Sequence, residues 1–186
     1  MRKNFGAKPF MYPMPVLIIG SYGEDGTPDA MNAAWGCIAD FNQIAIYLSA
    51  EHKTVKNILA KGAFTVSMAD ADHVVEADYV GMVSGNDVPD KVERAGLTVS
   101  KSEFVDAPIF DEFPMTLECK MVSFDEESEL VLGEIVNVSV DERVLDTDGK
   151  INPARLNPIT YDSANHAYLK LGEKVGNAFK DGAKLK

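Results

Sequence analysis

Cysteine is scarce in this sequence, and its two cysteines are not spaced as a pair. Cys37 and Cys119 lie far apart and no CxxC motif occurs. This spacing favours neither a disulfide framework nor a zinc ribbon. We expect two buried thiols in a reducing compartment.

Long apolar runs and an excess of positive charge are also missing. No run of 18 or more apolar residues occurs, and the N-terminus has basic residues without an apolar core, so we expect neither a signal peptide nor a membrane span. The net charge is -11 and the pI is about 4.7. Nucleic acid and anionic membranes would be repelled, so we expect neither as a partner. A single cytoplasmic domain over residues 1–186 is predicted from this length and composition.

The apolar pattern predicts strands joined mainly by hairpins. Asp25-Gly26 is a strong hairpin signal, and Gly133 inside a long strand indicates a bulge or a barrel bend. Regular alternation of strands and helices is absent, so the pattern predicts an antiparallel barrel with added helices. Strands are expected at residues 15–21, 28–39, 42–49, 63–68, 115–124 and 129–140. Helices are expected from Thr54, as N-cap, to Gly62, over 72–83 and over 90–95. We expect an arm lying on the domain before residue 15, mostly coil after residue 140, and a frayed tail.

One strand carries an unusually bare face. Ala30, Asn32, Ala34 and Gly36 alternate along residues 28–39 and would share a side. Such a face accommodates either a closely packed helix or a ligand, and spacing alone does not separate these alternatives. Asn32 favours a ligand slightly, because a buried amide needs a polar partner. The single tryptophan, Trp35, is more commonly a core anchor than a stacking platform.

A lysine precedes the first expected helix. Lys53 would oppose the helix dipole unless an anion binds there. Ser49, Lys53 and Thr54, with the free N–H groups of the helix start, would form a phosphate site. A solvated loop lysine is the alternative.

Several modest motifs occur in an order that resembles a known family. They are Pro15 to Gly20, Asn32-Ala-Ala-Trp35, Ser49 to Thr54 with Asn57-Ile58, Gly81-x-x-Ser84-Gly85, Asp90-Lys91, Ala107-Pro108, Glu118-Cys119 and Gly133-Glu-Ile135. Together they resemble the flavin reductase-like FMN-binding split-barrel family, particularly its flavoredoxin branch. The likeness covers a core from about Pro9 to Tyr168, leaving residues 1–8 as an arm and 180–186 as a tail.

The resemblance implies a mainly β fold, a six-stranded antiparallel split β-barrel with helical excursions, that forms a homodimer and binds FMN. Its cofactor-binding residues would lie in four groups. Those along the isoalloxazine ring would be Asn32, Ala33, Ala34 and Trp35; those near the ribityl chain, Ser49 and Ala50; those at the phosphate, His52, Lys53 and Thr54; those of a wall or lid, Ser84, Gly85 and Lys91. No catalytic side chain and no metal ligand is expected.

One position departs from the family pattern. Members that reduce free flavin with a nicotinamide cofactor resemble each other in a histidine five positions before the strand glycine, where this chain has Ser128. We therefore expect an FMN-dependent oxidoreductase that passes electrons from a donor to a flavin, a redox protein or a ferric chelate. The alternatives are an NAD(P)H:flavin oxidoreductase that supplies reduced FMN, and a non-enzymatic flavin carrier.

Overall fold

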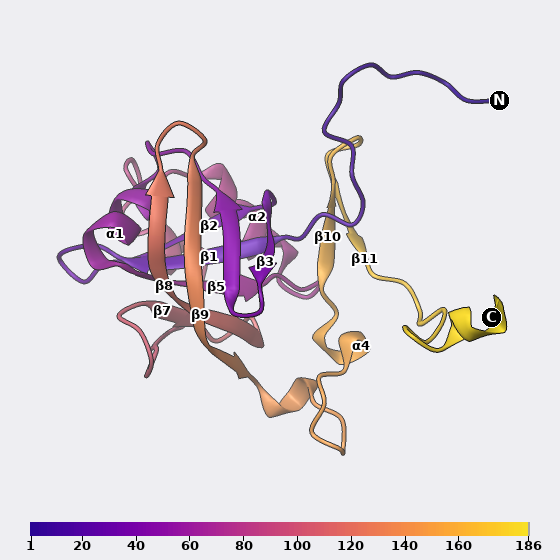
Figure 1. The fold of residues 1–186 in the computed structure, drawn as a ribbon. Helices are drawn as coiled ribbons and strands as arrows, with labels where there is room; N and C mark the ends of the chain where they lie inside the picture. The colour runs from indigo at the N-terminus through magenta and orange to yellow at the C-terminus, as the bar shows by residue number, and fades with distance from the viewer. Residues whose placement is uncertain (186) are drawn as a thin grey trace.

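The computed structural model describes residues 1–185 and is built on one curved antiparallel sheet (Figure 1). Its strand order is β2-β1-β5-β8-β9-β4-β3, and each neighbouring pair is antiparallel. The strands are β1 (Leu17–Tyr22), β2 (Pro28–Ala33), β3 (Gly36–Asp40), β4 (Gln43–Tyr47), β5 (Ala63–Met68), β8 (Met115–Asp125) and β9 (Leu130–Val140). The predicted class, a mainly β antiparallel split barrel, is confirmed.

The strand predicted over residues 28–39 is two strands rather than one. Its first part, β2, pairs with β1 as the Asp25-Gly26 signal predicts. After Ala34 and Trp35 the chain crosses to the opposite edge of the sheet, where β3 pairs with β4. The sheet therefore has seven strands instead of six, and its two free edges are consecutive in the chain. The barrel is split between these two edges, because β2 and β3 do not pair with each other.

The concave side of the sheet holds the main core. Side chains from six of the strands and from the first helix meet there, among them Ile19, Ile46, Val55, Phe64 and Val131. Gly133 faces the Phe64 ring so closely that an added Cβ would overlap it. Opposite Gly133, the register of β8 against β9 shifts between Met121 and Ser123. The predicted bulge is confirmed, and the glycine lets the sheet curl around Phe64.

Helix α1 (Lys53–Lys61) ends as predicted but begins differently. Gly62 adopts φ +66° and donates its N–H to the Ile58 carbonyl, which is a glycine stop. The N-cap is His52, so the prediction of Thr54 was wrong. The Thr54 hydroxyl donates instead to the buried carboxylate of Asp29, which is why it does not cap the helix.

Helices α2 (Val74–Met82) and α3 (Lys91–Arg94) cover the outer side of β2. A second core of Ala30, Ala77, Val80 and Val92 joins them to the strand. At Gly81 an added Cβ would lie 2.8 Å from the Cβ of Asn32, so α2 sits directly on the strand. In the connection that follows, β6 (Val99–Lys101) and β7 (Pro108–Phe110) form a separate two-stranded ribbon.

The coil predicted after residue 140 was wrong. It contains η1 (Glu142–Val144), α4 (Pro153–Leu156) and a hairpin of β10 (Ile159–Asp162) and β11 (Ala167–Lys170). The hairpin turn has no glycine; Asp162 accepts the N–H groups of Ala164 and Asn165, and His166 takes φ +53°. The tail ends in an exposed turn, η2 (Asp181–Leu185), where fraying was expected.

The N-terminal arm does not lie on the barrel as predicted. Residues 1–13 are exposed and run beside the β10–β11 hairpin, where Tyr12 donates to Asp162 and the Ser163 hydroxyl donates to the Pro9 carbonyl. The hairpin and both chain ends lie on the side of the barrel away from α1 (Figure 1).

The two cysteines differ in burial, so the prediction of two buried thiols was half wrong. Cys119 lies in the barrel core, where burial, with the neighbouring Glu118 carboxylate, raises the pKa of its thiol to about 12. Cys37 is exposed because β3 is an edge strand. Within residues 1–185, no helix is long and apolar enough to cross a membrane.

Candidate functional site

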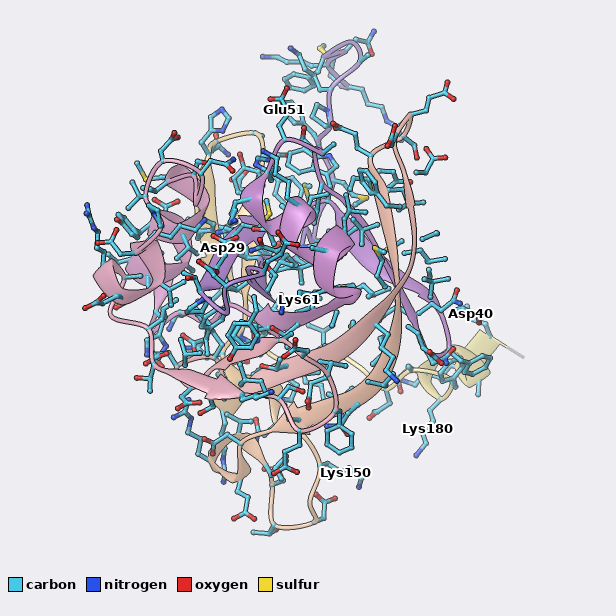
Figure 2. The ribbon with its side chains drawn as sticks, turned by 90° about the vertical axis from the view of Figure 1, so that its left-hand side faces the viewer. Asp29, Asp40, Glu51, Lys61, Lys150 and Lys180 are labelled. Carbon is cyan, nitrogen blue, oxygen red and sulfur yellow. The ribbon has the colours of Figure 1, made fainter. Side chains whose placement is uncertain are left out.

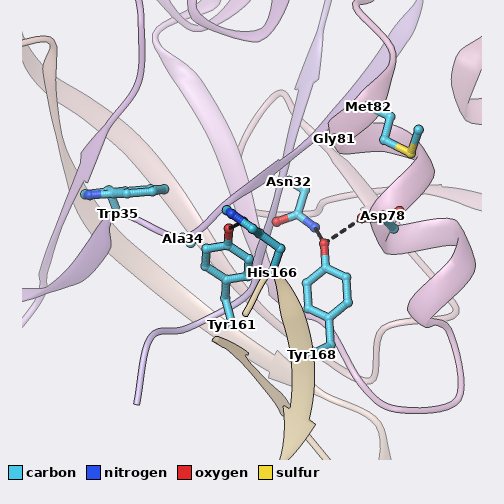
Figure 3. Close-up of a pocket in the computed structure, with 9 residues that line it drawn as sticks. All are labelled: Asn32, Ala34, Trp35, Asp78, Gly81, Met82, Tyr161, His166 and Tyr168. Carbon is cyan, nitrogen blue, oxygen red and sulfur yellow. Dashed lines mark hydrogen bonds between the residues drawn. The ribbon is translucent and has the colours of Figure 1, made fainter. Parts of the chain in front are cut away.

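An aromatic cavity of about 340 Å³ opens at the break between β2 and β3 (Figure 3). Three parts of the chain form it: the end of β2 with the break itself, helix α2, and the β10–β11 hairpin. Its lining residues are Asn32, Ala34, Trp35, Asp78, Gly81, Met82, Tyr161, His166 and Tyr168. Trp35 is 50% exposed, so it is not a core anchor; its ring stands on the side of the cavity away from Asp78.

A hydrogen-bonded chain runs along one wall of this cavity. The Tyr168 hydroxyl donates to Asp78 Oδ1 over 2.7 Å, and it accepts from Asn32 Nδ2 over 3.4 Å. Asn32 Nδ2 also donates to the Ala77 carbonyl over 3.0 Å. Burial, followed by the Asp78 carboxylate, raises the pKa of Tyr168 to about 12, so this phenol keeps its proton at neutral pH.

The hairpin supplies a second polar pair to the cavity. The Tyr161 hydroxyl lies 3.0 Å from Nδ1 of His166. The positive φ of His166, at the end of the turn, places its ring beside Tyr161. With Trp35 these rings give the cavity a largely aromatic wall (Figure 3).

A lysine cavity of about 270 Å³ lies at the other end of β2. It is lined by Asp25, Thr27, Pro28, Asp29, Lys53, Gly85, Asn86 and Pro89. Lys53 is the first residue of α1, and the first turn of that helix carries no acidic side chain. At Gly85 an added Cβ would overlap the Asp29 carboxylate and lie 3.1 Å from Cγ of Lys53, so only glycine lets the loop approach here.

A buried ionic network lies beneath the lysine cavity. Asp29, beside helix α1 in Figure 2, is 4% exposed and accepts from the Thr54 hydroxyl. Lys91, 2% exposed, places Nζ 3.2 Å from Asp29 Oδ1 and donates to the carbonyls of Val80 and Val83 at the end of α2. The network fixes α1, α2 and α3 against β2.

The two cavities are linked by the free edge of β2. Asp29 and Asn32 are three residues apart on this strand, which is about 10 Å at the usual rise. β2 pairs only with β1, so every second backbone N–H and C=O points outward. The edge joins the aromatic cavity to the lysine cavity across a row of hydrogen-bonding groups.

The predicted binding residues fall into three groups in the structure. Asn32, Ala34 and Trp35 line the aromatic cavity, and Lys53 and Gly85 line the lysine cavity. A second group does not reach either cavity wall: Ala33 faces the barrel core, and Thr54 and Lys91 bond to Asp29 below. The third group, Ser49, Ala50, His52 and Ser84, lies in the loops before α1 and after α2, outside both linings.

Sequence reasoning missed the other half of the aromatic cavity. Asp78, Tyr161, His166 and Tyr168 come from segments that were predicted as an acidic helix and as coil. Asp29 was missed as well. The signal available for Asp29 was its position three residues after Gly26, inside a strand, because a carboxylate buried there without a partner is costly.

Comparison with known proteins now places the chain in a family. Residues 10–165 match the flavin reductase like domain. The chain belongs to the flavin reductase like domain family. The predicted resemblance is thereby confirmed. In this chain Ser128 lies at the tip of the β8–β9 hairpin, where its N–H and its hydroxyl both donate to Asp125 Oδ1 over 2.7 Å.

Solved structures of similar proteins share the fold. The flavoredoxin of Desulfovibrio vulgaris (Miyazaki F) is 36% identical with a TM-score of 0.94, covering 98% of this chain and 100% of that one. The flavoredoxin from Methanosarcina acetivorans is 26% identical with a TM-score of 0.90 over 100% of both chains. An FMN-binding domain of a flavin reductase-like enzyme from Shewanella baltica is 22% identical, with a TM-score of 0.79 over 88% of each chain, and shares the fold.

A curated relative is longer than this chain. An uncharacterized protein of Aeropyrum pernix is 30% identical over 129 residues, which make up 67% of this chain and 48% of that protein. The chain therefore spans about half of the length of that relative.

Proposed function

We propose that the chain binds FMN along the free edge of β2 and transfers electrons between a reduced donor and an acceptor. One observation carries this proposal: the aromatic cavity and the lysine cavity lie along the free edge of one strand, where Asn32 lines the first and Asp29, about 10 Å away, lines the second. A ligand that matches both ends is a planar heterocycle joined by a short chain to a phosphate. Membership of the flavin reductase like domain family supports FMN as that ligand.

Different residues would hold the two ends of FMN. Trp35 and Asn32 would contact the ring, and the outward backbone groups of β2 would bond its polar edge. At the other end, Lys53 and the free N–H groups of the first turn of α1 would bind the phosphate, with Ser49 and Ala50 toward the ribityl chain. Bound FMN supplies the electron-transfer chemistry; the chain positions it and sets its potential.

The proposed electron donor is not a free nicotinamide cofactor. Ser128 cannot act as an imidazole, and at the exposed hairpin tip it is flanked by Glu127 and Glu129 and bonded to Asp125. The backbone of this tip is tied to the end of β4, since the Leu48 N–H donates to the Glu129 carbonyl, and β4 is tied in turn to the Trp35 carbonyl through the Tyr47 N–H. Carboxylates at this position would repel the phosphates of a dinucleotide.

Purified protein is expected to be yellow, or to become so on addition of FMN, with flavin bands near roughly 370 and 450 nm from the cofactor itself. FMN should bind more tightly than riboflavin because only FMN reaches the lysine cavity. A protein that stays colourless and takes up no FMN contradicts the proposal. Anaerobic mixing with NADH or NADPH then separates the alternatives. Rapid bleaching of the flavin indicates an NAD(P)H:flavin oxidoreductase. A bound flavin that no redox protein can reduce indicates a carrier.

We also propose that the chain forms a homodimer. The support is the apolar surface of the two chain ends, whose large side chains do not pack on the barrel of the same chain. The exposed side chains are Phe5, Phe10 and Met11 at the N-terminal end and Val175 and Phe179 at the C-terminal end. A mass of about twice 20.3 kDa by light scattering is expected. A monomer at micromolar concentration contradicts this proposal and leaves FMN binding untouched.

A further inference from the structure

The wall of the aromatic cavity fixes the orientation of the Asn32 amide. Its Nδ2 donates to the Ala77 carbonyl and to the Tyr168 hydroxyl, which accounts for both amide hydrogens. The oxygen is on the other side of the group, toward Ala34 and His166 (Figure 3). Asn32 therefore offers the cavity an acceptor, and a ligand that meets it there needs an N–H donor.

Tyr168 cannot reverse this arrangement at neutral pH. Its pKa of about 12 keeps the phenol protonated, and its single proton is donated to Asp78 Oδ1 over 2.7 Å. Toward Asn32 it can only accept. The three groups come from β2, β11 and α2, so the chain of hydrogen bonds also ties these elements together at the cavity.

The chain of hydrogen bonds ends in a negative charge at the cavity wall. Asp78 is half-buried, and no lysine or arginine lines the cavity within residues 1–185. Tyr168 holds the carboxylate against the cavity. An oxidised flavin that takes up two electrons and one proton becomes one charge more negative, so a fixed carboxylate nearby opposes its reduction.

We infer that Asp78, held in place by Tyr168, lowers the reduction potential of the flavin in the aromatic cavity. Asp78 acts by its charge, and Tyr168 is a positioning residue. This inference rests on the proposed binding of FMN.

The test measures, for each variant, the Kd of oxidised FMN and the Kd of reduced FMN. The midpoint potential of the FMN-loaded variant is measured as well, by anaerobic titration against a reference dye. In Asp78→Asn, the ratio of the Kd for reduced FMN to the Kd for oxidised FMN should fall about tenfold, which raises the potential by about 30 mV for two electrons. Tyr168→Phe should move the potential in the same direction by less, because the carboxylate is then free to turn toward water. Asp72→Asn removes the same charge from an exposed position just before α2 and should change the ratio less than twofold.

The outcomes separate this inference from the proposed function. If Asp78→Asn changes both Kd values equally, or lowers the potential, Asp78 is only structural and the inference is wrong. If Asp78→Asn does not fold, an unchanged potential in Tyr168→Phe overturns the inference by itself. If the wild-type protein binds no FMN at all, the proposed function fails before this comparison begins.

Discussion

Replacement of Lys91 by methionine is expected to lower the free energy of unfolding by about 3–5 kcal/mol. The change leaves the Asp29 carboxylate buried without its cation, and it removes the donor from the last carbonyls of α2. Urea denaturation of the flavin-free protein measures the effect. Lys101→Met is the control, because its ammonium pairs with Asp106 at 3.6 Å on the surface, where about 0–1 kcal/mol is expected.

Two further observations would decide the role of Lys91. Neutralising both partners, in Asp29→Asn with Lys91→Met, should recover part of the lost stability, since no buried charge then remains unpaired. A loss below about 1 kcal/mol in Lys91→Met, joined to a tenfold weaker FMN complex, would instead place Lys91 at the ligand. That result would support the lid role that the family resemblance implies for Lys91 and contradict the role in the buried network.

Replacement of Lys53 by alanine is expected to weaken FMN about 10- to 100-fold while changing the Kd of riboflavin less than twofold. The loss of a charge-assisted hydrogen bond to phosphate costs about 1.5–3 kcal/mol, and each 1.4 kcal/mol is about tenfold in Kd. Fluorescence titration with both ligands measures the difference.

The control for this prediction is Lys61→Ala, at the opposite end of the same helix. Lys61 pairs with Asp106 and lines neither cavity. Its removal should leave both Kd values near those of the wild type. Equal weakening of FMN and riboflavin in Lys53→Ala would show that Lys53 does not reach the phosphate.

Local signals carried the parts of the fold that the sequence predicted well. Asp25-Gly26 turns the chain into β2, Gly62 ends α1, and Gly133 marks the bulge. In each case glycine allows a backbone conformation or a close contact that a residue with a side chain does not allow. The signal therefore lies within a few residues of the feature that it predicts.

The errors arose where distant segments decide the outcome. Ala34 and Trp35 carry no turn signal, and the chain crosses there only because the curled sheet brings its two edges together. The turn of the β10–β11 hairpin is closed by Asp162, without glycine, so it read as coil.

The candidate site shows the same division between local and distant information. Half of the aromatic cavity was visible in the motif from Asn32 to Trp35, with Lys53 marking the lysine cavity. The other half depends on Tyr168 meeting Asp78, 90 residues away in sequence. Thr54 and Lys91 were predicted to bind the cofactor, but in the structure both bond to Asp29. The sequence around Asp29 carried no functional signal from which this partner could be predicted.

The position of the split has a consequence for the handling of the protein. A free strand edge is where a sheet can add strands from another molecule, and the two free edges of this sheet, β2 and β3, are joined by only two residues, Ala34 and Trp35. Ile38 and Cys37 are exposed on the second of them. A group bound along β2 shields that edge, so the proposed cofactor would act as a cap against edge-to-edge association there as well as a carrier of electrons.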